Sequence, residues 1–312
     1  MFQTNNRSSW VLLASAIIVG FVSIFLVPST SNSNVILHIR LPRVLEAWTI
    51  GAGLAVAGLA YQSAFKNPVV SPSILGVSFG AGVGAALAFL MGLGHLVPVS
   101  SAIFGMLTVA IVWSIANAIS KDTASLLIIG VIVSGVSSSI LSLIKFVADP
   151  EGVLPAITYW LLGSFSTARL THIWVLICIL IIIGLFYRFR WLLDILSTPS
   201  ALVASAGLDE RKAIAIVVVG ATLISALSTS IAGVVSMIGL AIPHAVRAWR
   251  GTDSNLDIMR DTVLLGGLFA LVLDTVIRML PLELPVGVLT NLCGAFIFGF
   301  ALLVLRRGAG RD

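Results

Sequence analysis

Long apolar runs alternate with short polar breaks along almost the whole chain. Most runs are near the ~20 residues that an α-helix needs to cross a bilayer. The pattern predicts an all-α, polytopic membrane protein with about ten transmembrane helices. Because no long linker or low-complexity tract interrupts the runs, residues 1–312 are predicted to form a single transmembrane domain. The predicted spans are residues 10–27, 44–65, 73–92, 97–119, 123–147, 172–188, 212–231, 236–249, 258–280 and 286–305.

The break between the second and third runs is a polar turn followed by a span of small residues. Pro68 and Pro72 interrupt any helix that continues from the preceding run, because proline lacks an amide donor and restricts the residue before it. Gly76, Gly80 and Gly84 then recur every four residues, which places them on one face of a helix. That face is predicted to let another backbone approach closely.

The composition excludes an ordinary soluble domain. Hydrophobic residues make up 58% of the chain, charged residues make up 10%, and the mean hydropathy is +1.11, whereas soluble domains carry ~25% charged residues. An N-terminus inside the cell leaves 13 of the 18 Lys and Arg residues on the cytoplasmic side, as the positive-inside rule requires. Both termini are therefore predicted to be cytoplasmic, and the net charge of +5 gives no reason to expect a nucleic-acid partner. The basic residues predicted outside are Arg40, Arg43, Lys145, Arg169 and Arg278.

Motifs for nucleotide binding, metal binding and catalysis are missing from the sequence. There is no phosphate-binding loop of the Walker A type, so any ATP must be hydrolysed by a partner. Cys178 and Cys293 each lie in an apolar run, where a free cysteine usually behaves as a small hydrophobic residue. The four histidines show no metal-ligand spacing. We expect no metal site, no cofactor and no enzymatic activity.

Two carboxylates are predicted to lie within the apolar zone, Glu46 near the outer end of the second span and Asp274 near the outer end of the ninth. Asp274 and Arg278 have the i,i+4 spacing of an ion pair, which is either structural or functional. A proton-coupled carrier would be expected to have carboxylates at mid-depth, and none is predicted there. This favours a transporter driven by a partner, although sodium coupling through backbone carbonyls stays open as an alternative.

Serines cluster in the fifth span, where Ser134, Ser138 and Ser142 recur every four residues on one helix face. Serine in a membrane helix often donates to the carbonyl one turn back, so packing at a helix interface is one interpretation. The other is a slightly polar lining for a passing solute.

Several sequence blocks, in order and with consistent spacing, resemble the signature of one family. The blocks lie at residues 40–43, 66–68, 75–81, 239–247 and 283–288. They are similar to those of the bacterial permeases for iron-siderophore, haem and cobalamin uptake, the FecCD/BtuC-type membrane subunits of type II ABC importers. The resemblance covers about residues 36–307.

The resemblance implies a set of partners in the bacterial cytoplasmic (inner) membrane. Such a permease has ten spans and pairs with a second permease subunit, identical or homologous. It binds two cytoplasmic ABC ATPase subunits and receives its substrate from a periplasmic or lipid-anchored binding protein. By position, the resemblance assigns docking of the binding protein to Arg40, Arg43 and Arg278. Their side chains would face outward and pair with glutamates on the binding protein.

The resemblance also implies a cytoplasmic gate and a coupling segment. The gate would combine Asn67 and Val69 with Thr123 and Ala124. As a structural alternative, Asp122 or Thr123 would cap the fifth span. Residues 198–208 are predicted to form a short helix that ends near Gly207. This helix is either the segment that contacts the ATPase or an interfacial helix lying on the bilayer. The residues assigned to ATPase coupling are Ser200, Ala204, Gly207 and Leu208.

The expected substrate is an iron chelate, with a ferric siderophore first. Ser200 departs from the glutamate that many family members carry, which leaves the chemistry of the ATPase contact open. Haem, cobalamin and molybdate are alternative substrates of the same machinery, and an ion-coupled secondary transporter is the alternative mechanism.

Overall fold

The computed structural model describes residues 6–25, 33–119, 123–281 and 284–309, so Asp122 and Glu283 lie outside the described residues. Every regular element in these ranges is a helix, which confirms the all-α fold. Each predicted span coincides with one helix. These helices are α1 (Asn6–Phe25), α3 (Leu41–Ala64), α4 (Val77–Leu90), α5 (Val97–Ile119), α6 (Thr123–Val147), α8 (Ile173–Arg188), α11 (Glu210–Ala232), α12 (Ile238–Arg250), α13 (Asn255–Met279) and α14 (Val286–Ala309).

Within the described ranges, seven helical segments are long and apolar enough to cross a membrane, and α1 and α4 are shorter apolar helices. α12 has only 13 residues, which is too short to span a bilayer by itself. Shorter elements connect the main helices: α2 (Ser33–Val35), η1 (Ile36–Arg40), η2 (Gly94–Leu96), α7 (Val153–Leu161), η3 (Leu170–His172), α9 (Arg190–Leu196) and α10 (Ser200–Ser205).

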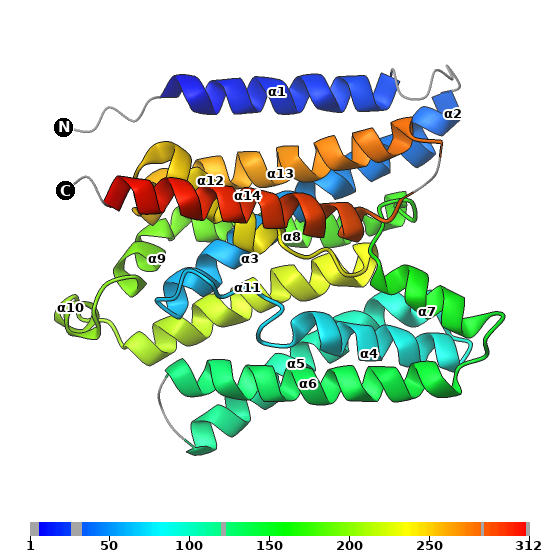
Figure 1. The fold of residues 1–312 in the computed structure, drawn as a ribbon, viewed down its shortest axis with the longest axis horizontal. Helices are drawn as coiled ribbons and strands as arrows, with labels where there is room; N and C mark the ends of the chain where they lie inside the picture. The colour runs from blue at the N-terminus through cyan, green and yellow to red at the C-terminus, as the bar shows by residue number, and fades with distance from the viewer. Residues whose placement is uncertain (1–5, 26–32, 120–122, 282–283, 310–312) are drawn as a thin grey trace.

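The long helices lie roughly side by side, and the start of α1 and the end of α14 lie at one end of the bundle, here called the terminal end (Figure 1). α3 is the central helix and packs against α8, α11, α12 and α13. Its glycines make this possible, because a Cβ at Gly51 would collide with the carbonyl of Gly266, and one at Gly58 with the carbonyl of Gly239. Small residues thus bring α13 and α12 into backbone contact with α3.

The glycine-rich span packs closely against α5, as predicted. A Cβ at Gly80 would collide with Thr108, and one at Gly84 would lie 2.5 Å from the carbonyl oxygen of Ser100. Gly76 precedes α4 and has a φ of 82°, but it also packs against α5, because a Cβ there would lie 2.9 Å from Thr108 Cγ2. The span begins at Val77 rather than at residue 73, since a left-handed residue cannot continue an α-helix.

Candidate functional site

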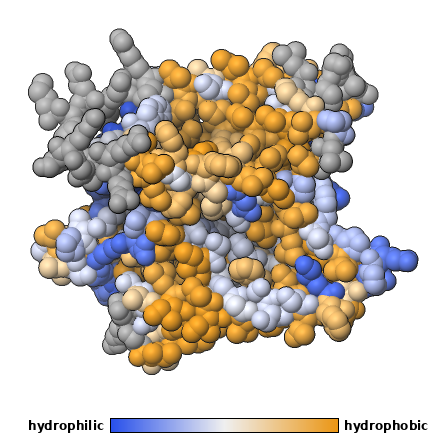
Figure 2. Space-filling model, viewed as in Figure 1, coloured by the Kyte–Doolittle hydropathy of each residue, from blue (hydrophilic) through white to orange (hydrophobic). Residues whose placement is uncertain are grey.

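One face of the molecule carries two long helices with exposed apolar side chains. α6 and α14 lie on this face, with the turn before α4 and the link between α11 and α12 running between them (Figure 1). Figure 2 shows apolar areas over both helices and a less hydrophobic band between them. Apolar surface on this scale marks contact with lipid or with another protein. The exposed side chains include Ile128, Val131, Ile132, Val136, Leu143 and Phe146 of α6, and Leu292, Phe296, Phe300 and Leu303 of α14.

The three serines predicted to line a pathway differ in exposure. Ser134 is buried and donates to the carbonyl of Gly130 at 2.6 Å. Ser138 is half-buried, whereas Ser142 is exposed and donates to the carbonyl of Ser138 at 2.9 Å. The bonding to the carbonyl one turn back is therefore present for Ser134 and Ser142. Their role as a pathway lining stays a prediction, and only Ser138 and Ser142 are accessible for it.

The turn predicted to form part of the gate starts from a strained residue. Lys66 has a φ of 49°, which is uncommon for a residue other than glycine. The amide of Val69 donates to the side-chain oxygen of Asn67 at 3.0 Å, the local bond of an Asx turn. Val69 is 53% exposed, so its side chain projects from the turn.

Lys66 connects this turn to the predicted coupling segment. Its Nζ donates to Ser200 Oγ at 3.0 Å and lies 2.5 Å from Glu210 Oε1. Ser200 Oγ donates to the same carboxylate oxygen at 3.0 Å. The three side chains therefore join the end of α3, the start of α10 and the start of α11. Sequence reasoning missed the role of Lys66 and Glu210, because their separation of 144 residues leaves no local signal.

The predicted short helix is confirmed as α10, which ends at Ser205. Gly207, which follows it, has a φ of 75°. Val203 is buried and attaches α10 to the body of the subunit. Ala204 and Gly207 are exposed, and Leu208 is half-buried. Val203 is the one buried residue of α10, and the rest of the helix is exposed. Its contact with an ATPase stays a prediction.

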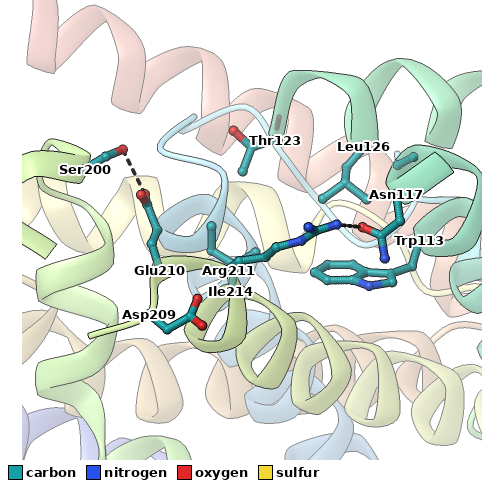
Figure 3. A pocket seen from close by; sticks show the side chains of 10 residues that line it. Trp113, Asn117, Thr123, Leu126, Ser200, Asp209, Glu210, Arg211 and Ile214 are labelled. Atoms are coloured by element: carbon teal, nitrogen blue, oxygen red, sulfur yellow. Dashed lines mark hydrogen bonds between the residues drawn. The ribbon is translucent and has the colours of Figure 1, made fainter. Parts of the chain in front are cut away.

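A cavity of about 370 Å³ lies beside α10 at the terminal end. Figure 3 shows Arg211 reaching across it to Asn117 of α5, to which it donates a hydrogen bond. Thr123 lines this cavity, whereas Asn67, Val69 and Ala124 do not. The structure therefore does not bring the four predicted gate residues of one subunit into a single pocket.

Asp209, another lining residue, caps α11. Its carboxylate accepts a hydrogen bond of 3.2 Å from the amide of Lys212. This bond stabilises the ionised form and lowers the pKa of Asp209 below its ordinary value. The start of α11 therefore keeps a negative charge on its exposed surface.

The end of the bundle opposite the terminal end is called the outer end, because the sequence predicts that it faces outward. It holds a buried cluster of charges. Arg43 Nε donates to Asp274 Oδ1 at 2.8 Å, and Arg278 Nε lies 3.2 Å from Asp274 Oδ2. The predicted pair of Asp274 and Arg278 is thus confirmed, with Arg43 as a further member. Asp274 is fully buried, and a buried carboxylate requires such partners.

The arginines assigned to docking are turned into the subunit. Arg40 is 2% exposed and Arg43 is 7% exposed, and the side chain of Arg278 is also 7% exposed. Arg40 and Arg278 donate to carbonyls at the end of α1, at 2.9 and 3.1 Å. The expectation that these guanidinium groups face outward is wrong for this conformation, because Asp274 and the α1 carbonyls hold them inside.

A second polar pair lies at the same end. His172 Nδ1 is 2.8 Å from Glu46 Oε2, which joins the start of α8 to α3. The sequence indicated Glu46 as a carboxylate in the apolar zone but not its partner, since 126 residues separate the two. Both carboxylates predicted in the apolar zone therefore have a basic partner.

Known proteins match this chain along nearly its whole length. The model of the FecCD transport family matches residues 5–306. This chain belongs to the FecCD transport family. The molybdate import system permease protein MolB of Haemophilus influenzae is 34% identical over 89% of this chain and 83% of its own. A probable iron chelatin transport system permease protein of Helicobacter pylori is also 34% identical, over 89% of this chain and 85% of its own.

A solved structure gives the same fold. It is described as an inward-facing conformation of a metal-chelate type ABC transporter, with a TM-score of 0.87 and 30% identity over 96% of this chain and 99% of the other. The FecCD membership and this match show a multi-pass permease subunit of an ABC importer, which is a transport component and not an enzyme. The resemblance inferred from the sequence blocks is confirmed.

Proposed function

We propose that this permease carries an iron chelate, with a ferric siderophore as the first choice, into the bacterial cytoplasm. The supporting observation is the whole-length match to a permease described for iron chelatin transport and to a metal-chelate type transporter. Molybdate is the second candidate, and the Haemophilus relative supports it. Cobalamin is a further candidate, supported by relatives named as cobalamin or vitamin B12 import permeases that are 32% and 33% identical to this chain. Haem follows from the family alone.

The test is uptake by a reconstituted complex. The permease is purified with its ATPase and binding protein, placed in liposomes, and supplied with ATP and either a radioactive ferric siderophore or molybdate. ATP-dependent uptake of the siderophore supports the proposal. Uptake of molybdate alone would identify molybdate as the substrate instead. Uptake without the ATPase, driven by a sodium gradient, would favour the secondary-transporter mechanism instead.

The apolar face of α6 and α14 is proposed to meet a second permease subunit, identical or homologous. Two cytoplasmic ATPases and a periplasmic or lipid-anchored binding protein complete the importer. Intact-complex mass spectrometry tests this, with two permeases and two ATPases expected. A complex with one permease would contradict it.

Both termini are proposed to lie in the cytoplasm of a cell whose inner membrane holds the complex. The terminal end would then carry α10, the 370 Å³ cavity and the gate turn, all facing the ATPases. Cysteine placed at exposed Asp253, near the start of α13, should react with an impermeant maleimide only after the membrane is opened. Labelling in intact cells would reverse the orientation.

Coupling is proposed to run from α10 to the gate through Lys66. ATP would close the paired ATPases and move α10 with Ser200 and Glu210, and Lys66 would transmit this movement to Asn67 and Val69. The pathway would then open to one side of the membrane at a time. This order of contacts assigns Lys66 as a positioning residue rather than a substrate ligand.

Docking of the binding protein is proposed to use the outer end, where Arg40, Arg43 and Arg278 lie. A carboxylate on the binding protein would have to compete with Asp274 and the α1 carbonyls for them. Docking would therefore rearrange the buried cluster of charges. An ion pair between exposed side chains, in contrast, would only guide the approach of the binding protein. This gives a route by which an event outside loosens contacts between α1, α3 and α13.

A further inference from the structure

A small recess lies where the turn before α4 meets the link before α12. Its volume is about 30 Å³, and none of the described residues that line it is charged. Half of the lining residues carry a hydroxyl group, and they define what we call the hydroxyl recess: Ser71, Ser73, Ser78, Ser225, Thr229 and Ser236.

Three of these hydroxyls are already satisfied. Ser71 and Ser73 share a hydrogen bond of 2.8 Å, and Ser225 donates to the carbonyl of Ala221 at 2.8 Å. The side-chain hydroxyls of Ser78, Thr229 and Ser236 make no hydrogen bond to any described residue. Thr229 is only 5% exposed as a residue, and it lines the recess. The recess therefore keeps unused bonding capacity in an interior position.

Two helices begin at the hydroxyl recess and run away from it in opposite directions, α4 toward the outer end and α12 toward the terminal end (Figure 1). Ser78 lies in the first turn of α4 and Gly239 in the first turn of α12. Their amides have no hydrogen-bond partner among the described residues. First-turn amides carry the positive end of the helix dipole, so both helices favour negative charge at this place.

The hydroxyl recess lies on the face that carries α6 and α14, which the proposed function takes as the transport pathway. The two segments that form it, the turn before α4 and the link before α12, lie between the exposed helices α6 and α14 (Figure 1). Ser78 and Ser236 are half-buried, so the recess is open enough for a solute on that face to reach it.

We infer that the hydroxyl recess is a cargo-contact site for an anionic oxygen group, either a carboxylate of a chelate or the oxygens of a tetrahedral oxyanion. A volume of about 30 Å³ accepts roughly two oxygen-sized atoms, so an end group enters and the body of a chelate stays outside. Hydroxyl and amide donors with the positive ends of two helices suit an anion. The inference rests on the proposed function, because it takes this face as the transport pathway.

The first experiment measures access and occupancy directly. Ser236→Cys is introduced after Cys178→Ala and Cys293→Ala, and the complete transporter in liposomes is labelled with maleimide without ATP. Citrate or molybdate, compared with chloride at equal ionic strength, should slow labelling of the cysteine at 236. Protection by citrate identifies a carboxylate cargo, and protection by molybdate identifies an oxyanion. Glu151→Cys, in an exposed loop, is the matched control and should show no protection.

Equal labelling at 236 in all three salts would overturn the inference, because the recess would hold only water. A cysteine at 236 that reacts only after denaturation would overturn it as well. Protection without any ATP-dependent uptake would refute the proposed function and support the anion site. Uptake without protection would support the proposed function and refute the anion site.

The second experiment removes one hydroxyl without changing volume. Thr229→Val should lower uptake of the protecting anion about fivefold, the effect expected for one lost hydrogen bond, with ATPase activity unchanged. Ser114→Ala on α5, an exposed serine bonded only to its own helix, is the control. Wild-type uptake by Thr229→Val would contradict a role in cargo contact.

Discussion

Lys66 Nζ lies 2.5 Å from Glu210 Oε1, and this ion pair joins the turn after α3 to the start of α11. Both side chains are about a quarter exposed, so the pair contributes at most about 1 kcal/mol to stability. Its value would lie in coupling these two segments, to both of which Ser200 is also hydrogen-bonded.

Lys66→Met should uncouple ATP hydrolysis from transport. Uptake is expected to fall about fivefold or more, the range of a coupling free energy between two sites, while the melting temperature and ATPase activity stay near wild type. Lys66→Glu combined with Glu210→Lys should restore part of the uptake. Lys212→Met, which removes an 82% exposed lysine nearby, is the control. Equal uptake by Lys66→Met and Lys212→Met would refute the coupling role.

Val69→Trp should slow transport in an assembled complex. The side chain is exposed on the turn, so folding should change by no more than about 0.5 kcal/mol. A bulky ring at a constriction would nevertheless obstruct the cargo. Uptake and complex yield, measured on the same preparation, separate the two effects. Loss of complex yield would show that Val69 supports packing instead.

Gly80→Leu should prevent assembly rather than slow transport. A Cβ here collides with Thr108, and overpacking costs roughly 1–3 kcal/mol or more. The yield of folded permease by size-exclusion chromatography is the measurement. Gly184→Leu on α8 is the matched control, because nothing lies within 4 Å of a Cβ at that position. A normal yield of the Gly80 variant would contradict the close packing of α4 on α5.

Asp274→Asn should destabilise the outer end. Removing the carboxylate leaves Arg43 and Arg278 without their shared anion, and loss of one partner of a buried ion pair costs about 3–5 kcal/mol. A lower thermal unfolding temperature is therefore expected. Asp253→Asn, an exposed substitution, is the control. Unchanged stability would mean that the cluster is held by the α1 carbonyls alone.

Arg278→Gln should weaken docking of the binding protein and also lower stability. The first effect follows from the proposed docking site, and the second from the burial of Arg278 beside Asp274. Binding affinity for the purified binding protein is compared with the unfolding temperature of the permease. Reduced stability with unchanged affinity would confine Arg278 to a structural role.

The spans were predictable because a bilayer imposes one length and one polarity on each helix. The ten runs therefore coincide with helices, and the spacing of Gly80 and Gly84 correctly indicated close packing against a neighbour. Gly76 shows the limit of such periodicity. Gly76 has the same four-residue spacing as Gly80 and Gly84, but its left-handed φ places it before the start of the helix.

Sequence alone thus determined the membrane class, the helix positions and the family, since these depend on local composition and on blocks of adjacent residues. Only the tertiary structure decided which polar groups meet. Lys66 with Glu210, Arg43 with Asp274, and the two helix ends around Thr229 each join segments far apart in the chain. Such contacts depend on how the helices pack in three dimensions, and hydropathy along the chain carries no information about that packing.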